Sequence, residues 1–241
     1  MRKLRHDSTE VISRAAQPAL WLLVFGQVMN QMRAIPTGGL PYIDFLAPGI
    51  LAQSVLFIAI FYGIAIIWER DLGIVQKFLV SPAPRTAQVL GKGLAAGVRA
   101  LAQALIIYAL AALMGVDLNW NPLALLGVAA VVVCGAAVFS LFSLLVACLV
   151  KTRERFMGFG QVMTMPLFFA SNAIYPVSLM PSWLQVIARL NPLTYEVDAL
   201  RALMLRGGTS VYGVGMDLLV LVGIAAVLAV AGGRLYPNVV T

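Results

Sequence analysis

The side chains that could carry out chemistry are few in this sequence, and they are scattered. The chain of 241 residues holds one histidine, His6, and ten acidic residues. A serine-type hydrolase needs a base within reach of its nucleophile, and a metal-dependent enzyme needs clustered acids or histidines. The acids here stand singly or beside basic residues, as Asp71 and Glu154 do, and none forms a pair at helical spacing inside an apolar segment. The sequence therefore predicts that the chain is not an enzyme.

Ion-coupled transport is also not indicated, because such proteins usually keep an ionisable group at mid-membrane depth. The nearest candidates are Glu196, Asp198 and Asp217, and we expect all three toward the outer side of the membrane. Cys134 and Cys148 lie fourteen residues apart in one apolar run, which excludes a short-range disulfide and indicates packing residues.

A source of energy is missing as well. The phosphate-binding pattern G-x-x-x-x-G-K-[ST] is not matched around Gly91-Lys92, since Thr86 stands five residues before Gly91 and Gly93 follows Lys92. We therefore expect no cofactor in this chain. If the protein moves something actively, a partner chain must bind ATP and magnesium.

The composition indicates whether the chain is surrounded by water or by lipid. Apolar residues make up 61% of the sequence and charged residues 11%, with a mean hydropathy of +0.92. Soluble domains average about 45–50% apolar and about 25% charged residues. A helix needs about 20 residues to cross a bilayer. We predict an all-α membrane protein in which residues 18–241 form a single transmembrane domain with six transmembrane helices.

The pattern of apolar and polar residues along the chain predicts its helices and loops. Residues 1–17 have the spacing of an amphipathic helix that lies in the membrane interface. A cytoplasmic loop covers 69–92, and a proline-broken stretch over 173–213 predicts short re-entrant outer helices between the fifth and sixth crossings. The predicted crossings cover residues 18–32, 45–68, 94–115, 122–150, 156–172 and 214–233.

The basic residues predict the orientation. Thirteen of the seventeen lysines and arginines fall in the N-terminal segment, the region 69–99, the turn 151–155 and the C-terminal tail. Positive loops stay on the cytoplasmic side, so both termini should be cytoplasmic. The net charge of +7 is thereby explained by the topology of the chain in the lipid bilayer, and no nucleic acid partner is needed.

Three pieces of the sequence together resemble a known family. They are YIDFLAPGILAQSVLF from Tyr42 to Phe57, WERDLGIVQKFLVSPAPRTAQVLGK from Trp68 to Lys92, and LNPLTYEVDALRALML from Leu190 to Leu205. In this order and spacing they are similar to the permease subunits of ABC-2 type exporters, which include daunorubicin-resistance-like drug exporters and polysaccharide exporters. The resemblance covers nearly the whole chain. It implies two copies of a cytoplasmic ATPase subunit, a second permease that is identical or homologous, and the plasma membrane of a prokaryote.

The resemblance also implies where the ATPase would dock. A coupling helix would lie over 69–80, where Ile74 pairs with Phe78 and Val75 with Leu79 at i and i+4. A second, smaller docking point would be the turn 151–155. The coupling residues implied are Glu69, Arg70, Ile74, Val75, Phe78, Leu79, Lys151, Arg153 and Arg155. Two alternatives stay open: the acidic and basic run that begins at Glu69 is a plain interfacial stop, and the turn serves only topology.

The substrate path follows from the resemblance in the same way, as a lining made by the first, second and fifth crossings at a dimer interface. The residues implied are Gln27, Asn30, Gln31, Gln53, Phe57, Gln161, Thr164 and Phe168. An apolar lining with a few uncharged hydrogen-bonding groups suits an amphipathic or lipid-like cargo, such as a drug, lipid or glycolipid. The alternative for each polar residue is a contact that holds two helices together. The alternative for the whole chain is a non-pumping channel, a scaffold, or a membrane enzyme with an unrecognised site.

Overall fold

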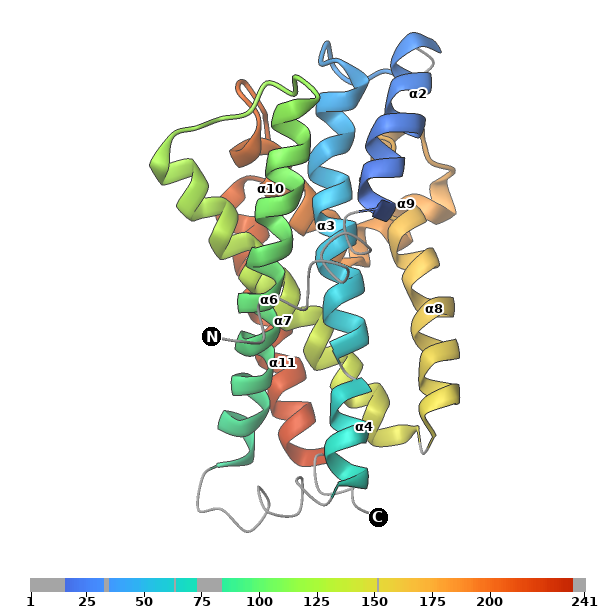
Figure 1. The fold of residues 1–241 in the computed structure, drawn as a ribbon, viewed down its shortest axis with the longest axis vertical. Coiled ribbons are helices and arrows are strands. Elements are labelled where there is room, and N and C mark those ends of the chain that lie inside the picture. Colours follow the sequence, from blue (N-terminus) through green and yellow to red (C-terminus); the bar gives the residue numbers. More distant parts are fainter. Residues whose placement is uncertain (1–15, 33–34, 63, 73–83, 151, 236–241) are drawn as a thin grey trace.

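The computed structural model describes residues 16–32, 35–62, 64–72, 84–150 and 152–235. These residues form a bundle of long helices: α3 (Tyr42–Tyr62), α4 (Ile64–Asp71), α6 (Arg85–Leu113), α7 (Pro122–Leu149), α8 (Arg153–Phe169) and α11 (Val214–Leu235) (Figure 1). The one β contact in the described part of the chain is an isolated antiparallel bridge between Leu118 and Leu205. The all-α prediction is confirmed.

Four segments are long and apolar enough to cross a membrane. They are Tyr42–Arg70, Arg85–Leu113, Pro122–Leu149 and Val214–Leu235. The predicted first crossing contains the π-helix η2 (Trp21–Gly26) and α2 (Gln27–Met32), and the predicted fifth is α8, with 17 residues. Over the residues that the structure describes, both are shorter than the roughly 20 residues that a bilayer needs. Six crossings therefore stay a prediction, while four spans are supported by length and composition.

Two helix starts correct the predicted boundaries. Helix α6 begins at Arg85, nine residues before the predicted start at 94, because Pro84 precedes it with extended backbone (φ −58°, ψ 136°). Helix α8 begins at Arg153 rather than at the predicted start at 156. The Thr152 side chain accepts a hydrogen bond from Arg155 N at 3.4 Å and caps the helix. The polar residues near both helix starts lie inside the helices, because a helix can continue beyond the apolar layer of the membrane.

Helix α7 occupies the centre of the bundle and packs against α3, α6, α10 (Pro192–Met204) and α11. Its contact with α6 is close at Gly97, where an added Cβ would lie 2.9 Å from Val133 Cγ1. The core contains bulky side chains from α3, α7 and α8, including Phe139 and Phe168. Gly97 is thus a packing residue, as its spacing from Gly93 indicates.

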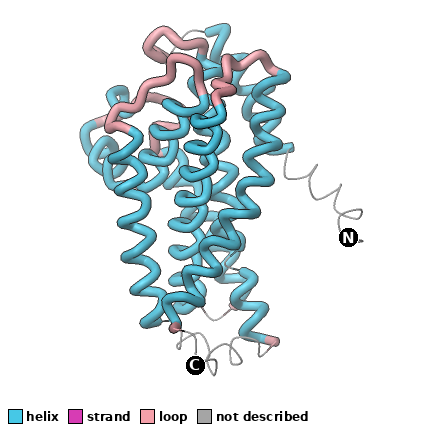
Figure 2. Tube along the Cα trace, turned by 90° about the vertical axis from the view of Figure 1, so that its left-hand side faces the viewer, coloured by secondary structure: helices cyan, strands magenta, loops and turns pink. Residues whose placement is uncertain are grey.

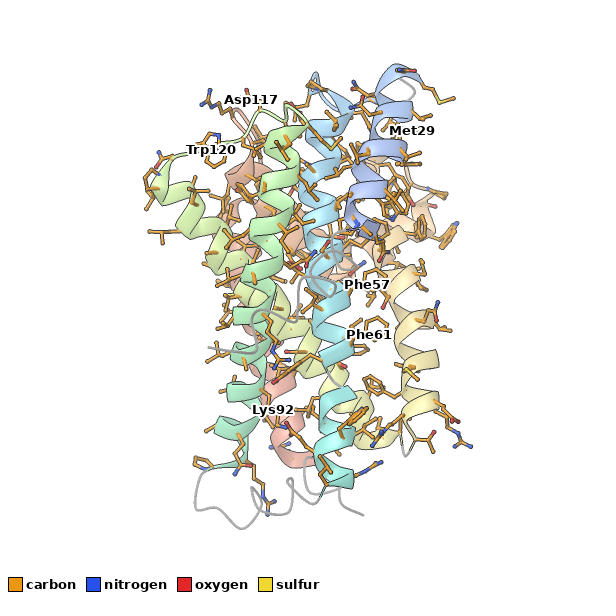
Figure 3. The ribbon with its side chains drawn as sticks, viewed as in Figure 1. Met29, Phe57, Phe61, Lys92, Asp117 and Trp120 are labelled. Atoms are coloured by element: carbon orange, nitrogen blue, oxygen red, sulfur yellow. The ribbon has the colours of Figure 1, made fainter. Side chains whose placement is uncertain are left out.

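The bundle has two different ends, which Figure 1 and Figure 2 show at the bottom and top. At the bottom lie α4 and the start of α6 with Lys92, which we call the Lys92 end. At the top lie the described loops and Asp117, which we call the Asp117 end (Figure 3). The stretch 173–213 contains η3 (Val177–Leu179), α9 (Ser182–Leu190) and α10. Insertion of these short helices into the membrane stays a prediction.

Candidate functional site

Two of the residues proposed for a substrate path meet at a cavity. Gln53 and Phe57 of α3 line a space of about 220 Å³, together with Gln17 from the helical segment 16–20 and Gln103 from α6. Three carboxamides from three segments thus border one cavity, and none of the described side chains that line it is charged. Such a lining can exchange hydrogen bonds with a neutral polar group without an ionic partner. The sequence analysis missed Gln103, although a glutamine within an apolar 29-residue helix was the signal.

An aromatic pair extends from this cavity along α3. Phe57 and Phe61 stack with ring centroids 6.1 Å apart and an interplanar angle of 7° (Figure 3). Phe61 is exposed, whereas Phe57 is partly buried. The cavity therefore joins hydrogen-bonding amides to an apolar aromatic surface.

Three other proposed path residues have contacts within the protein. The Asn30 Oδ1 accepts from Tyr42 N at 2.9 Å, so Asn30 connects α2 to the start of α3. Thr164 donates to Gly160 O at 2.6 Å within its own helix. Phe168 is buried and meets the Trp21 ring edge to face at 5.7 Å. The Asn30 and Phe168 contacts fit the alternative in which these side chains hold the bundle together, whereas the Thr164 hydrogen bond stays within α8.

The remaining three path residues are exposed and do not line the cavity. Gln27 and Gln31 lie on α2, and Gln161 lies on α8. They border no described cavity with Gln53. Their part in a path stays a prediction.

At the Lys92 end, charged and aromatic side chains connect three helices. The Lys92 Nζ of α6 forms an ion pair with Glu69 Oε2 of α4. The Arg153 guanidinium of α8 lies 4.0 Å from the ring centroid of Trp68 of α4, within the range of a cation–π contact. The proposed coupling residues Glu69 and Arg153 therefore share one surface region.

The other coupling residues divide into two groups. Arg70 is partly buried on α4 and Arg155 is exposed on α8. Lys151, Ile74, Val75, Phe78 and Leu79 lie outside the described residues. The proposed coupling helix is therefore a prediction from the sequence.

Helix α10 carries buried ionisable residues that the sequence analysis did not include in a site. The Glu196 side chain is fully buried, and neither carboxyl oxygen has a hydrogen-bond partner among the described residues. A Cβ added at Gly135 would overlap with the Glu196 carboxyl group. Gly135 lies halfway along α7, 13 residues after Pro122 and 14 before Leu149. The sequence predicts Glu196 toward the outer side, and in the structure its helix α10 packs against the middle of α7, a candidate membrane span.

The burial of Glu196 determines its charge. Removal from water disfavours an ionised carboxylate, so burial raises the pKa of the Glu196 carboxyl well above its usual value. A neutral carboxyl is far less costly than an unpaired charge at this depth.

Arg201, one turn further along α10, is buried but has partners. Its Nη2 donates to Asn172 O at 2.8 Å, and its guanidinium lies 3.8 Å from the ring centroid of Phe45. Burial lowers the pKa of Arg201 to about 10, which leaves it charged at neutral pH. The arginine therefore connects α10 to α3 and to the segment after α8.

Asn191 caps the start of α10. Its Oδ1 accepts from Leu193 N at 3.0 Å, and its Nδ2 donates to Leu167 O at 2.7 Å and to Ala170 O at 2.9 Å. Asn191 thus joins the start of α10 to the end of α8.

A second, apolar cavity of about 550 Å³ lies between α8 and α9. Trp183 and Ile187 of α9 face Met163 and Leu167 of α8 across it. The described lining is almost entirely apolar, which suits an acyl chain or a ring system.

Comparison with known proteins agrees with this architecture. A family model described as ABC-2 type transporter matches residues 1–205. A putative transport permease ycf38 of Cyanophora paradoxa is 30% identical over 207 residues, covering 83% of this chain and 70% of the relative. The daunorubicin resistance ABC transporter permease protein DrrB1 of Streptomyces coeruleorubidus is 28% identical over 239 residues, covering 99% of this chain and 83% of the relative. Nodulation protein J of Rhizobium leguminosarum bv. trifolii is 27% identical over 197 residues, covering 81% and 74%.

Proposed function

The chain belongs to the ABC-2 type transporter family, and from this premise we propose that it is the membrane-spanning subunit of an ATP-driven exporter. As a member of this family it is a membrane transport permease. The proposed cargo is an amphipathic or lipid-like compound, which leaves the cytoplasm through this subunit. One relative is named for daunorubicin resistance, which supports a cargo of this kind.

The observation that supports this cargo class most directly is the cavity bordered by Gln53, Gln103 and Phe57. Carboxamides can donate and accept hydrogen bonds, and the stacked Phe57 and Phe61 rings provide an apolar surface beside them. The described lining has no charge with which to select an ion. A compound with a neutral polar part and an apolar body fits this combination.

Energy would come from a separate ATPase. In this proposal, two copies of the cytoplasmic subunit bind ATP and magnesium and dock at the Lys92 end. Glu69 and Arg153 lie there beside Trp68, and the predicted coupling helix begins at Glu69. A second permease, identical or homologous, would complete the transporter.

The proposed location is the plasma membrane of a prokaryote, with both termini in the cytoplasm. This orientation puts the Lys92 end inside the cell and the Asp117 end outside. Single cysteines at positions 2 and 151 should resist an impermeant reagent added to intact cells, whereas a cysteine at the exposed Ser182 should react. Labelling of position 151 from outside would show that the orientation is the reverse of the one proposed.

The decisive experiment reconstitutes the permease in vesicles with an ATPase encoded beside its gene, with daunorubicin as the probe. We expect ATP-dependent movement of the probe, and ATPase turnover that the probe stimulates. An ATPase variant without its phosphate-binding lysine should abolish both. The variant Phe78→Asp should weaken ATPase binding or stimulation, because it would bury an unpaired charge at the docking surface. Probe flux that is equally fast without ATPase would instead identify a non-pumping channel.

A further inference from the structure

The loop between α10 and α11 is held by one carboxylate of α10. The Asp198 Oδ2 accepts hydrogen bonds from Val211 N at 2.8 Å, from Tyr212 N at 3.0 Å and from Ser210 Oγ at 2.8 Å. Asp198 is fully buried. Its position therefore sets the path of the loop into α11.

A second buried carboxyl group uses the same serine. Asp217, in the first turn of α11, is also fully buried, and its Oδ2 lies 3.0 Å from Ser210 Oγ. The Ser210 Oγ in turn accepts from Gly213 N at 2.6 Å. One hydroxyl oxygen thus has two carboxyl groups and one backbone N–H as close neighbours.

The hydrogen atoms of this cluster can be counted. A serine hydroxyl has a single hydrogen and can donate it to only one of the two carboxyl groups. The other short contact is a hydrogen bond only if that carboxyl group is protonated and donates to Ser210. Two ionised carboxylates sharing one site repel each other, so one of them holds a proton more tightly.

We propose that Asp198 and Asp217 hold one proton between them, carried by Asp217, and that it latches the α10–α11 loop to the start of α11. Asp217 donates to Ser210 Oγ, and Ser210 donates to Asp198. The latch is a property of the fold and does not depend on which compound the protein moves.

The surroundings identify Asp217 as the protonated partner. The Asp198 Oδ2 accepts from two backbone N–H groups, and the Ser210 hydroxyl completes a set of three donors around this oxygen. Ser210 is the one hydrogen-bond partner of the Asp217 side chain among the described residues, whereas the Asp198 Oδ2 also has Val211 N and Tyr212 N as donors. The Oδ1 atoms of both carboxyl groups are buried without a partner among these residues.

The other titratable groups near Asp217 are few. Asp198 acts on it from α10, and Tyr212 lies close to it in the loop. Helices α6 and α7 also pack against α11, and their described residues contribute no titratable group that acts on Asp217. Once Asp217 has lost its proton at high pH, its negative charge would therefore be repelled by the negative charge of Asp198.

Thermal stability against pH tests the latch in the full-length permease in lipid nanodiscs. Loss of the proton removes one hydrogen bond and adds a second negative charge, so wild-type stability should fall as the pH rises. In Asp217→Asn, the amide N–H donates to Ser210 at every pH, so this fall should become smaller. Glu196 is present in both proteins, and its contribution cancels in the comparison. The matched variant Asp198→Asn should be less stable at every pH, because Arg201 loses its counter-charge.

Infrared difference spectra provide a test in the folded protein. The spectrum of wild type minus Asp217→Asn at mildly acidic pH should contain the C=O band of a protonated carboxyl group, and this band should disappear at high pH. Absence of the band at mildly acidic pH would overturn the proposal, as would pH curves that stay parallel in wild type and Asp217→Asn. Wild-type stability that rises with sodium at constant ionic strength, with no such rise in Asp217→Asn, would also overturn it, because a bound metal cation would then neutralise the pair.

Discussion

The Glu196 carboxyl group occupies the space that a side chain at Gly135 would need. The two residues are 61 positions apart in the sequence and lie on α10 and α7. Glycine at this position leaves room for a buried acid at the middle of a candidate membrane span. The close packing of α10 on α7 at this pair therefore buries the Glu196 carboxyl group, and this burial favours its protonated form.

The variant Gly135→Ala should unfold at a lower temperature. Its methyl group would overlap with the Glu196 carboxyl, and overpacking of a core costs about 1–3 kcal/mol. In the double variant with Glu196→Ala, the loss should be smaller than the sum of the two single losses. Gly223→Ala on α11 is the control, because its Cβ would meet nothing within 4 Å. Strictly additive losses at positions 135 and 196 would show that the two groups do not compete for space.

Wild-type stability should decrease relative to Glu196→Gln as the pH rises. The pKa of the Glu196 carboxyl is raised above its usual value of 4.5 in the folded protein, so the folded state binds the proton more tightly than the unfolded state. The contribution to the free energy of unfolding is complete below about pH 4.5 and is lost as the pH rises through the folded-state pKa. Melting temperatures of both proteins across the pH range measure the difference.

Gln53→Leu and Asn30→Leu should affect different properties. Gln53 lines the cavity, so its loss should raise the cargo concentration needed for half-maximal transport, while a polar contact in a membrane contributes only about 0.6 kcal/mol to stability. Asn30→Leu removes the acceptor of Tyr42 N–H and should cost about 1 kcal/mol of stability with little change in that concentration. Gln103→Leu should resemble Gln53→Leu. If Gln53→Leu and Asn30→Leu lower stability equally and neither changes this cargo concentration, the cavity is not part of the substrate path.

Reversal of one charge in the Glu69–Lys92 pair should weaken stimulation of the ATPase, and reversal of both should restore it. The pair connects α6 to Glu69 of α4, the residue at which the predicted coupling helix begins. Partly exposed ion pairs contribute little to stability, about 1 kcal/mol at most, so melting temperatures should change only slightly. ATPase turnover in the reconstituted complex of Glu69→Lys, Lys92→Glu and the double variant measures this. A double variant as inactive as either single variant would mean that each side chain contacts the ATPase separately.

Much of the fold could be predicted from local properties of the chain. A helix buries its own backbone groups, so apolar length predicts a spanning helix without knowledge of its neighbours. This reasoning identified the segments that became α3, α7 and α11, and the ordered pieces such as Tyr42–Phe57 identified the family. It failed at the start of α6, where Lys92 suggested a loop. A polar residue indicates contact with water or with a partner, and it does not indicate that a helix ends.

The sites depended on which helices became neighbours. Hydropathy gives neither the depth at which a short helix packs nor the face of α6 that meets α3. For this reason Glu196 was expected toward the outer side of the membrane, without Gly135 as its neighbour, and Gln103 was not considered. Contact of α10 with the middle of α7, and of α3 with α6, brought Glu196 to Gly135 and Gln103 to Gln53. The physical reason is that a single helix determines its own hydrogen bonds, whereas the surroundings of each polar side chain are determined by packing between helices far apart in the sequence.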